Sequence, residues 1–253
     1  MSPLALARRS DASPPPPEHH FRAMGSDAHV IIVGGNESML ALAIDRIEEL
    51  ESRWSRFRPD SEVSVLNAHS GQPVPMSADT RLLVARAVEA WRLTGGSFDP
   101  TLLDDLQRAG YDRSFEQLSH GSGLRTSLAR RRTASAAACT DIVVDDCSVT
   151  LPFGMSFDAG GIGKGLAADL VARGLIDRGA RTVLVSLGGD LRARGEPPPD
   201  GAWDIPVEDP GDEDRVAFRY PLVAGALVTS TTAYRNWRRN GRRYHHIIDP
   251  ATG

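Results

Sequence analysis

The stretch Phe157-Asp158-Ala159-Gly160-Gly161-Ile162-Gly163-Lys164-Gly165 places four glycines within six residues, directly before an amphipathic segment. Glycines ahead of a helix N-terminus let backbone N–H groups approach an anion, and Lys164 adds a point charge, so the stretch suits a phosphate. A tight strand-to-helix turn explains the same residues equally well. The stretch is not a Walker A motif, because Asp158 replaces its first glycine and Gly165 its Ser or Thr. Its glycine intervals also differ from the GxGxxG dinucleotide fingerprint.

The segments on either side of this stretch predict a hairpin, a helix and a strand. Before it, two short β-branched runs at residues 142–144 and 149–151 flank an Asp-Asp turn, as in a hairpin. After it, apolar residues recur at helical spacing up to Gly179, which is a suitable stop. Residues 182–187 then form an apolar strand that ends in Gly188-Gly189-Asp190. Two glycines there permit either the close approach of a ligand or a normal turn.

The N-terminal part of the chain predicts a strand followed by helices. Residues 28–33 are a short β-branched run, and apolar residues recur at three- and four-residue intervals over residues 37–54. A turn then leads to a short helix with Ser61 or Asp60 as its N-cap. A second amphipathic helix is expected with Asp79 as its cap and a stop at residues 94–96.

The middle and the end of the chain are less regular. Asp99 precedes a proline, and it is expected to cap the following helix rather than to point into a site. Residues 112–138 predict a surface excursion, and further strands are expected at 203–207, 216–220 and 226–229. Because two or three long helices and about seven short strands do not alternate strictly, the predicted fold class is α+β.

His245, His246 and Asp249 form a second candidate group near the end of the chain. A histidine with a carboxylate three residues on serves as a general base, a ligand or a ribose contact. A histidine at a strand end is more often a structural hydrogen bonder. Five arginines between residues 235 and 243 precede this group and either steer an anionic ligand or acidic acceptor, or lie in an exposed turn between two strands.

Bulk composition narrows the class of protein. The 253 residues carry 29 basic and 33 acidic side chains, and this net charge of −4 gives no pull toward nucleic acid. Cys139 and Cys147 lack the spacing of a zinc site or a disulfide framework. No apolar run is long enough for a secretory signal or a membrane span. We therefore expect a cytoplasmic protein with a disordered proline-rich leader at 1–19 and a single domain at 20–253.

Taken in order, these pieces resemble the ApbE-like family of flavin transferases. The resemblance runs from about Phe21 to the last residue and is carried by seven blocks in the family's order. The blocks are Met24-Gly25-Ser26; Ser55-Arg56-Phe57 through Ser61-Glu62-Val63 to Leu66-Asn67; Thr94-Gly95-Gly96-Ser97-Phe98-Asp99-Pro100-Thr101; Asp158 to Gly165; Gly188-Gly189-Asp190; Thr229-Ser230; and His246-Ile247-Ile248-Asp249-Pro250-Ala251-Thr252-Gly253.

The resemblance implies a fold of mixed or antiparallel sheets packed with helices, with an FAD cleft between the parts. It also implies a bimetal or magnesium-assisted cleavage of the FAD pyrophosphate, in which FMN passes to a Thr or Ser hydroxyl of an acceptor protein and AMP is released. Gly160, Gly161 and Lys164 would then lie near the diphosphate or the adenosine, and Asp158 would orient the loop. The carbonyl of Gly163 would correspond to a metal ligand.

Further roles follow from the same resemblance. His246 would lie beside the reacting phosphate or flavin, and Asp249 would be the second catalytic residue. The other expected FAD contacts are Met24, Asn67, Asp99, Gly188, Gly189, Asp190 and Ser230.

Two features depart from the family pattern. Thr231 follows Thr229-Ser230 where the family has glycine, and the sequence stops at Gly253, where the family continues to an Asp and a Thr that complete its metal site. A chain truncated at its C-terminus is therefore expected. Two alternatives to transfer stay open, namely an FAD pyrophosphatase that gives FMN and AMP, and a catalytically silent FAD-binding remnant.

Overall fold

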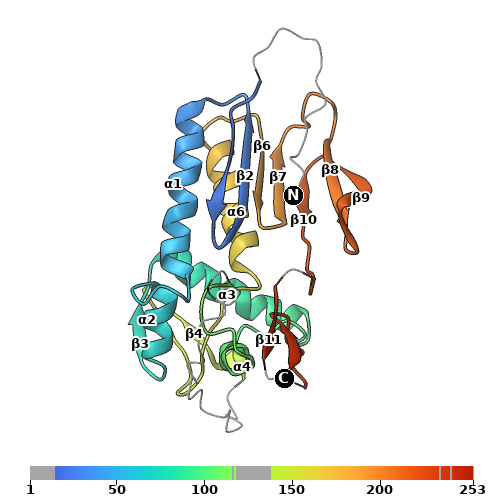
Figure 1. Cartoon of the computed structure of the whole chain (residues 1–253). Coiled ribbons are helices and arrows are strands. Elements are labelled where there is room, and N and C mark those ends of the chain that lie inside the picture. Colours follow the sequence, from blue (N-terminus) through green and yellow to red (C-terminus); the bar gives the residue numbers. More distant parts are fainter. Residues whose placement is uncertain (1–14, 116, 118–137, 234, 240, 253) are drawn as a thin grey trace. The chain divides into compact units, whose positions relative to one another are not determined.

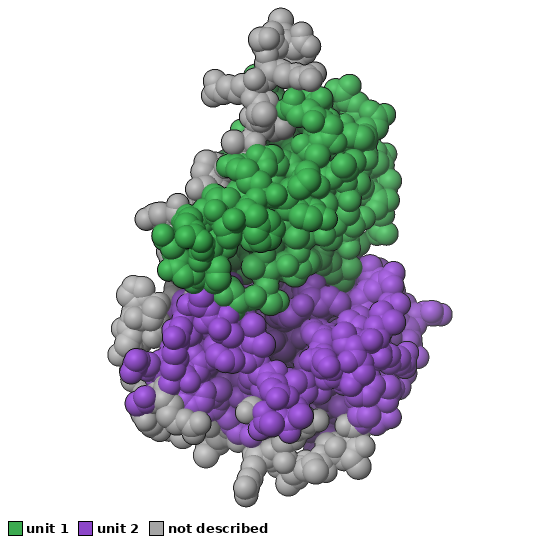
Figure 2. All heavy atoms as spheres, turned by 90° about the vertical axis from the view of Figure 1, so that its right-hand side faces the viewer, with its two compact units in different colours: residues 1–48, 164–231 green, residues 49–163, 232–253 purple. Residues whose placement is uncertain are grey.

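The computed structural model describes residues 15–115, 117, 138–233, 235–239 and 241–252, and these carry helices and antiparallel sheets (Figure 1). The expected α+β class is confirmed. Contacts divide the chain into two compact units, coloured in Figure 2, of which unit 1 comprises residues 1–48 and 164–231 and unit 2 comprises residues 49–163 and 232–253. Most of the expected leader and most of the excursion expected at 112–138 lie outside the described residues.

Unit 1 is built on a five-stranded antiparallel sheet with the order β1-β2-β6-β7-β10. Its strands are β1 (Glu18–Ala23), β2 (Ser26–Val33), β6 (Thr182–Leu187), β7 (Asp190–Gly195) and β10 (Gly225–Leu227). Strands β2 and β6 pair from Ala28↔Leu187 to Val33↔Thr182, and almost every residue in both is buried. Such nearly continuous apolar strands are typical of a sheet covered on both faces.

Helices cover one face of this sheet and a hairpin covers the other. Figure 1 shows α6 (Gly163–Ile176) and the first part of α1 (Glu37–Trp54) beside the sheet. The hairpin of β8 (Trp203–Asp209) and β9 (Asp212–Leu222) supplies side chains to the core on the opposite face. That core comprises Ile31, Val33, Leu184, Leu191, Ala193, Trp203, Ile205 and Leu222. Burial of this apolar surface is the main force that holds unit 1 together.

Unit 2 contains more helix than strand. It contains α2 (Glu62–Ala68), α3 (Ala78–Leu93), α4 (Leu103–Ala109), the short helix η1 (Cys139–Asp141), a small sheet of β3 (Pro73–Pro75), β5 (Ser148–Thr150) and β4 (Val143–Val144), and a hairpin of β11 (Asn236–Arg239) and β12 (Arg242–His245). The expected hairpin near residue 145 is confirmed by the β4–β5 pairing. The arginine run forms the strands β11 and β12 themselves, so it is not simply a turn between strands.

Among the strands missing from the expectations, β1 and β7 belong to the sheet of unit 1. Strand β1 begins at Glu18, two residues before the expected domain boundary, and it pairs with β2 along its whole length. Its residues Glu18, His19 and His20 have no apolar alternation, so only the pairing with β2 stabilises the extended form. Strand β7 follows the Gly188-Gly189 turn and carries arginines that hid its alternation. No helix among the described residues combines the length and the apolar character needed to cross a bilayer.

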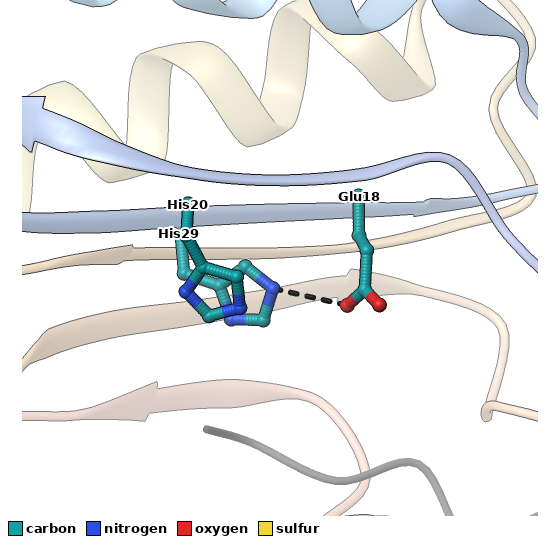
Figure 3. A group of neighbouring side chains, drawn as sticks. All are labelled: Glu18, His20 and His29. Atoms are coloured by element: carbon teal, nitrogen blue, oxygen red, sulfur yellow. Dashed lines mark hydrogen bonds and ion pairs between the residues drawn. The ribbon is translucent and has the colours of Figure 1, made fainter. Parts of the chain in front are cut away.

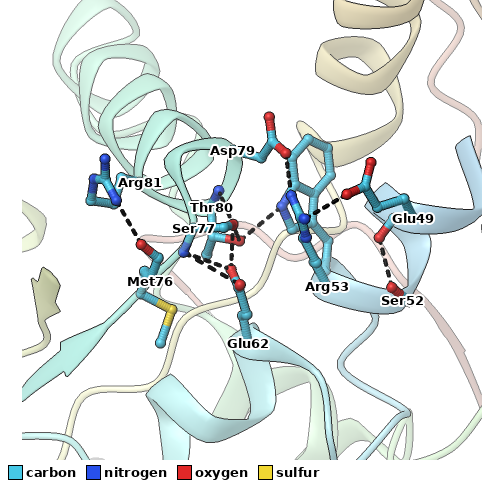
Figure 4. A network of polar contacts seen from close by, with 10 residues as sticks. Glu49, Ser52, Arg53, Glu62, Met76, Ser77, Asp79, Thr80 and Arg81 are labelled. Carbon is cyan, nitrogen blue, oxygen red and sulfur yellow. Dashed lines mark hydrogen bonds and ion pairs between the residues drawn. The ribbon is translucent and has the colours of Figure 1, made fainter. Parts of the chain in front are cut away.

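The N-cap of α3 is Ser77, and the expectation of Asp79 was wrong. Ser77 has extended backbone, and its hydroxyl oxygen accepts a hydrogen bond from the backbone N–H of Thr80 at 3.3 Å. The carboxylate of Glu62 in turn accepts from the Ser77 hydroxyl at 2.7 Å (Figure 4). Asp79 lies inside the first helical turn, where its carboxylate accepts from Arg53. A cap must precede the first helical residue, and Asp79 lies two residues after the cap position.

We expect Ser77→Ala to lower the free energy of unfolding by about 1–2 kcal/mol, because one N–H of α3 and the Glu62 carboxylate both lose a partner. Asp79→Ala removes a partly exposed ion pair with Arg53 and is expected to cost less than about 1 kcal/mol. Urea unfolding followed by circular dichroism measures both. A greater loss in Asp79→Ala than in Ser77→Ala would contradict the assignment of the cap.

Candidate functional site

The glycine-rich loop of residues 157–163 belongs to unit 2 and is fixed at its start by Asn67. The side-chain oxygen of Asn67 accepts from the backbone N–H of Phe157 at 2.7 Å, and its amide nitrogen donates to the carbonyl of Phe157 at 2.9 Å. Phe157 itself is fully buried. Both groups of the Asn67 amide are therefore used on one peptide segment, much as a neighbouring strand would use them. Asn67, expected as an FAD contact, positions the loop.

Asp158, the next residue, is held by a buried arginine. Its backbone N–H donates to the carbonyl of Pro100 at 2.8 Å, and its carboxylate lies 3.3 Å from Nε of Arg56. The Arg56 side chain is only 9% exposed and also donates to the carbonyl of Tyr111 at 2.9 Å. A low-dielectric setting strengthens such an ion pair but makes the loss of either partner costly. These contacts are compatible with the expected role of Asp158 in orienting the loop, which stays a prediction.

The glycines of the loop differ in how much space a side chain would have at each position. A Cβ added at Gly160 would lie 2.9 Å from the Asp158 carboxylate, and one at Gly161 would lie 2.8 Å from the Phe98 ring. Both contacts are shorter than Cβ atoms tolerate, so close approach accounts for these two residues. A Cβ at Gly163 would meet nothing nearer than 3.6 Å. Gly163 is the first residue of α6, and an alanine fits there without rearrangement.

Gly163→Ala is therefore expected to raise the free energy of unfolding by about 0.4–1 kcal/mol, because alanine reduces the freedom of the unfolded chain without strain in the folded one. Gly161→Ala is the opposing control and is expected to lower stability by about 1–3 kcal/mol through the contact with Phe98. Thermal unfolding of both variants, at equal protein concentration, checks the two signs. Destabilisation by Gly163→Ala would show that the loop has less room than the structure gives it.

Asp99 does not cap a helix, contrary to expectation. Helix α4 begins after Leu102, which makes no side-chain cap, whereas the Asp99 carboxylate accepts from the backbone N–H of Thr101 at 2.8 Å and from its hydroxyl at 2.6 Å. This is an Asx-type turn, for which a short acidic side chain before a proline is well suited.

Burial, and secondarily the charge of Asp99, raises the pKa of the Cys139 thiol to about 11. Cys139 is therefore not a nucleophile near neutral pH.

His246 follows the β11–β12 hairpin, which a row of aromatic rings anchors within unit 2. Trp237 stacks near Tyr244 with centroids 6.3 Å apart, lies 5.4 Å from the ring of Tyr111, and donates from its indole N–H to the carbonyl of Ala109 at 2.8 Å. His246 Nδ1 lies 3.4 Å from the carbonyl oxygen of Arg235. In the tautomer whose Nδ1–H donates to this carbonyl, Nε2 carries no proton. An unprotonated nitrogen is what a general base needs.

Asp249 shapes the turn after His246. It is exposed, and its carboxylate accepts from the backbone N–H of Ala251 at 2.8 Å. This local bond is another Asx-type turn. In the described residues Asp249 therefore supports the path of the chain beyond His246 rather than contacting the imidazole.

In unit 1, two tight turns lie next to each other at one end of the sheet. Met24-Gly25 joins β1 to β2, and Gly188-Gly189 joins β6 to β7. All four residues have positive φ, as two-residue type I′ hairpins require, and Met24 is the one non-glycine residue of this kind in the described part of the chain. The turns are linked because the Gly188 N–H donates to the carbonyl of Asp27 at 2.8 Å.

Lys164 and Asp190 extend this turn region of unit 1. The Lys164 ammonium lies 3.8 Å from the Asp190 carboxylate, and a Cβ at Gly188 would lie 3.2 Å from Lys164 Cε. Gly189 lies close to Thr229, which precedes the exposed Ser230. Five residues expected to contact FAD thus meet at one end of the sheet, although they are up to 166 positions apart in sequence. They are Met24, Lys164, Gly188, Gly189 and Asp190.

Sequence reasoning missed the residues that support these groups. Arg56 was quoted in a motif block but received no role, and the ring row of Tyr111, Trp237 and Tyr244 was not foreseen. The planar guanidinium of Arg56 also lies 4.3 Å from the ring centroid of Phe57 and 4.4 Å from that of Tyr111, as favourable cation–π pairs do. The one available signal was a basic residue directly after the end of a long amphipathic helix.

The model of the ApbE family matches residues 24–253. An FAD:protein FMN transferase of Vibrio cholerae is 30% identical over 219 residues, which are 85% of this chain and 64% of the relative. A protein of the same name from Treponema pallidum is also 30% identical, over 82% of this chain and 60% of its own length. The chain thus spans less than two thirds of either curated relative.

Solved structures agree with the sequence relatives. The ApbE protein from Thermotoga maritima superposes with a TM-score of 0.80 at 26% identity, covering 94% of this chain and 77% of the other. The apo flavinyl transferase ApbE of Pseudomonas stutzeri gives 0.72 at 27% identity, over 94% and 75% of the two chains.

Proposed function

The chain belongs to the ApbE family, and from this premise we propose that it is an FAD:protein FMN transferase. In the proposed reaction a Thr or Ser hydroxyl of an acceptor protein attacks the FMN-side phosphorus of FAD. A new oxygen–phosphorus bond forms, the bond to the bridging oxygen breaks, and AMP leaves. The proposal is supported by relatives that carry this name.

One observation in this chain carries the proposal further, namely the meeting of Met24, Lys164 and the Gly188-Gly189-Asp190 turn at one end of the unit 1 sheet. Glycine turns leave backbone groups accessible, and an ammonium offers charge to phosphate oxygens. Asp190, at 3.8 Å from the ammonium, keeps Lys164 directed toward the turns. We propose that Lys164 binds a diphosphate oxygen of FAD and that the two turns bind neighbouring parts of the same molecule.

In unit 2 we propose His246 as the general base that removes the proton from the acceptor hydroxyl. Its Nδ1 is set against the carbonyl of Arg235, and Asp249 holds the turn that follows. A base with a pKa near the working pH typically contributes about 10²–10⁴-fold to the rate. Asp158, Gly160 and Gly161 are proposed to shape the loop that receives the substrate. Asn67 bonds the loop at Phe157, and Arg56 pairs with Asp158.

Magnesium is part of the proposal. In the described residues no group of three acidic, histidine or cysteine side chains gathers at the glycine loop; the group that does gather lies in β1 and β2. The glycine loop therefore fits Mg²⁺ only in the ion's usual mode of binding, with few protein ligands and with several waters and phosphate oxygens. The Gly163 carbonyl is the proposed protein ligand. When bound, the cation would neutralise the diphosphate charge that builds up as AMP leaves.

We also propose a reducing, cytoplasmic setting for the chain. Cys139 is buried and Cys147 is exposed, and both remain free thiols. Disulfides are rare where cellular reductants keep thiols reduced.

The test is labelling of an acceptor protein. Incubation of the chain with FAD, Mg²⁺ and an acceptor that carries a Thr-containing target sequence is expected to give a fluorescent acceptor band that survives denaturing electrophoresis. The same acceptor with its target Thr replaced by Ala is the control and is expected to stay unlabelled. Absence of covalent flavin on the intact acceptor, with FAD binding preserved, would reject the transferase.

A further inference from the structure

Three side chains of the β1–β2 hairpin share one face of the ribbon. Glu18 and His20 are two residues apart in β1, so their side chains point to the same side, and His20 pairs directly with His29 of β2. Figure 3 shows the two imidazole rings stacked and the Glu18 carboxylate directed at the ring of His29. Within the described parts of the chain, this is the one such trio whose ligand atoms lie within 4.8 Å of one another.

The geometry is compact enough for one ion. The ring centroids of His20 and His29 are 3.5 Å apart, and Nε2 of His29 lies 3.1 Å from a Glu18 carboxylate oxygen. Ligands held about 2.1 Å from a tetrahedral metal lie about 3.4 Å from one another. The two rings are stacked, with an interplanar angle of 19°, so binding of one ion requires the exposed His20 ring to turn until a nitrogen of each ring faces the ion.

His29 is the buried member of the trio. Its side chain is 6% exposed, and its Nε2 is the ring nitrogen that faces the Glu18 carboxylate.

We propose that Glu18, His20 and His29 bind one divalent transition-metal ion, with zinc as the expected occupant. Two imidazoles and a carboxylate are a ligand set that zinc accepts, whereas magnesium prefers oxygen ligands alone. Glu18 and His20 are exposed, so a fourth position is open to water. The site lies wholly within the hairpin of unit 1 and does not depend on the proposed FMN transfer.

Zinc binding is measured on the full chain without a histidine tag. Equilibrium dialysis against zinc chloride at neutral pH, in the presence of excess Mg²⁺, is expected to retain one zinc per chain. His20→Ala and Glu18→Gln are each expected to weaken this binding at least about tenfold, which is the loss that even a supporting residue can cause. Both replaced side chains are exposed, so the variants are expected to stay folded, which thermal unfolding checks.

His19→Ala is the matched control. His19 is an exposed histidine of the same strand, but it points to the opposite face of the ribbon and pairs with Val30. It is expected to bind zinc like the unaltered chain. Failure of the unaltered chain to retain zinc would overturn the proposal, as would an equal loss in His19→Ala and His20→Ala. Either result leaves the acceptor-labelling test unaffected, so the two proposals fail separately.

Discussion

His246→Gln is expected to transfer FMN to an acceptor protein about 10²–10⁴ times more slowly than the unaltered chain. Glutamine keeps a polar side chain of similar length but cannot take up a proton from the acceptor hydroxyl. His246 is only partly buried, and its backbone N–H donates to the Arg235 carbonyl, a bond that glutamine keeps, so stability is expected to change little. The loss should appear in kcat, with the KM for FAD changed far less, because a base acts in the transition state.

His245→Gln is the matched control for this result. His245 is the neighbouring residue, is exposed, and ends strand β12 in pairing with Asn236. Side chains alternate along a strand, so His245 projects away from the side taken by Tyr244. Transfer by His245→Gln is expected to stay within about threefold, well below the effect of a positioned base. Equal losses in the two variants would remove His246 from the role of base.

Gly188→Ala is expected to lower the free energy of unfolding by about 2–4 kcal/mol. The new Cβ would lie 2.6 Å from the Ser26 hydroxyl and 2.7 Å from Ser26 Cβ, in a sheet end where β2 and β6 are tightly paired. Gly188 also has a φ of +61°, which costs alanine extra energy. Because Lys164 lies against the same turn, FAD binding is expected to weaken as well. Urea unfolding and FAD titration measure the two effects.

Gly25→Ala separates strain from overlap. Gly25 has a φ of +63° in the neighbouring turn, but a Cβ there would meet no described atom within 4 Å. It is expected to cost only about 1 kcal/mol. A second check is Ser26→Gly, in whose background the cost of Gly188→Ala is expected to fall, since the overlapping atoms are gone. If Gly25→Ala and Gly188→Ala lower the free energy of unfolding equally, the inference that the two turns pack closely at Gly188 is wrong.

Periodic apolar patterns were sufficient to predict the long elements. Helix α1 and strand β6 carry continuous signals, and the structure confirms both. The Ser61 cap of α2 is also confirmed, since its hydroxyl oxygen accepts from the Ser64 N–H. Strand β1 could not be found in the same way, because its residues are mostly polar and its extended form depends on pairing with β2, the next strand. The hairpin β11–β12 was missed for a related reason, because its strands are rich in arginine and pair with each other.

The sequence predicted the candidate site residues but not the residues that hold them in place. Motif order named Asn67, Asp158 and Lys164, yet spacing along the chain says nothing of their partners. Arg56 contacts Asp158 across 102 positions, and Asn67 bonds Phe157 across 90. Such long-range pairs depend on how the segments fold, so they become visible only in three dimensions. Asp99 shows the converse case, where a local turn satisfied a carboxylate that sequence alone assigned to a helix cap.

The dependence of AMP release on the acceptor tests the proposed transferase most directly. AMP is measured in parallel reactions of the chain with FAD and Mg²⁺, one with the acceptor protein and one without it. The account predicts AMP in the first reaction, in an amount equal to the FMN bound covalently to the acceptor, and very little AMP in the second. Equal AMP release in both reactions, with free FMN as the other product, would contradict it and identify an FAD pyrophosphatase.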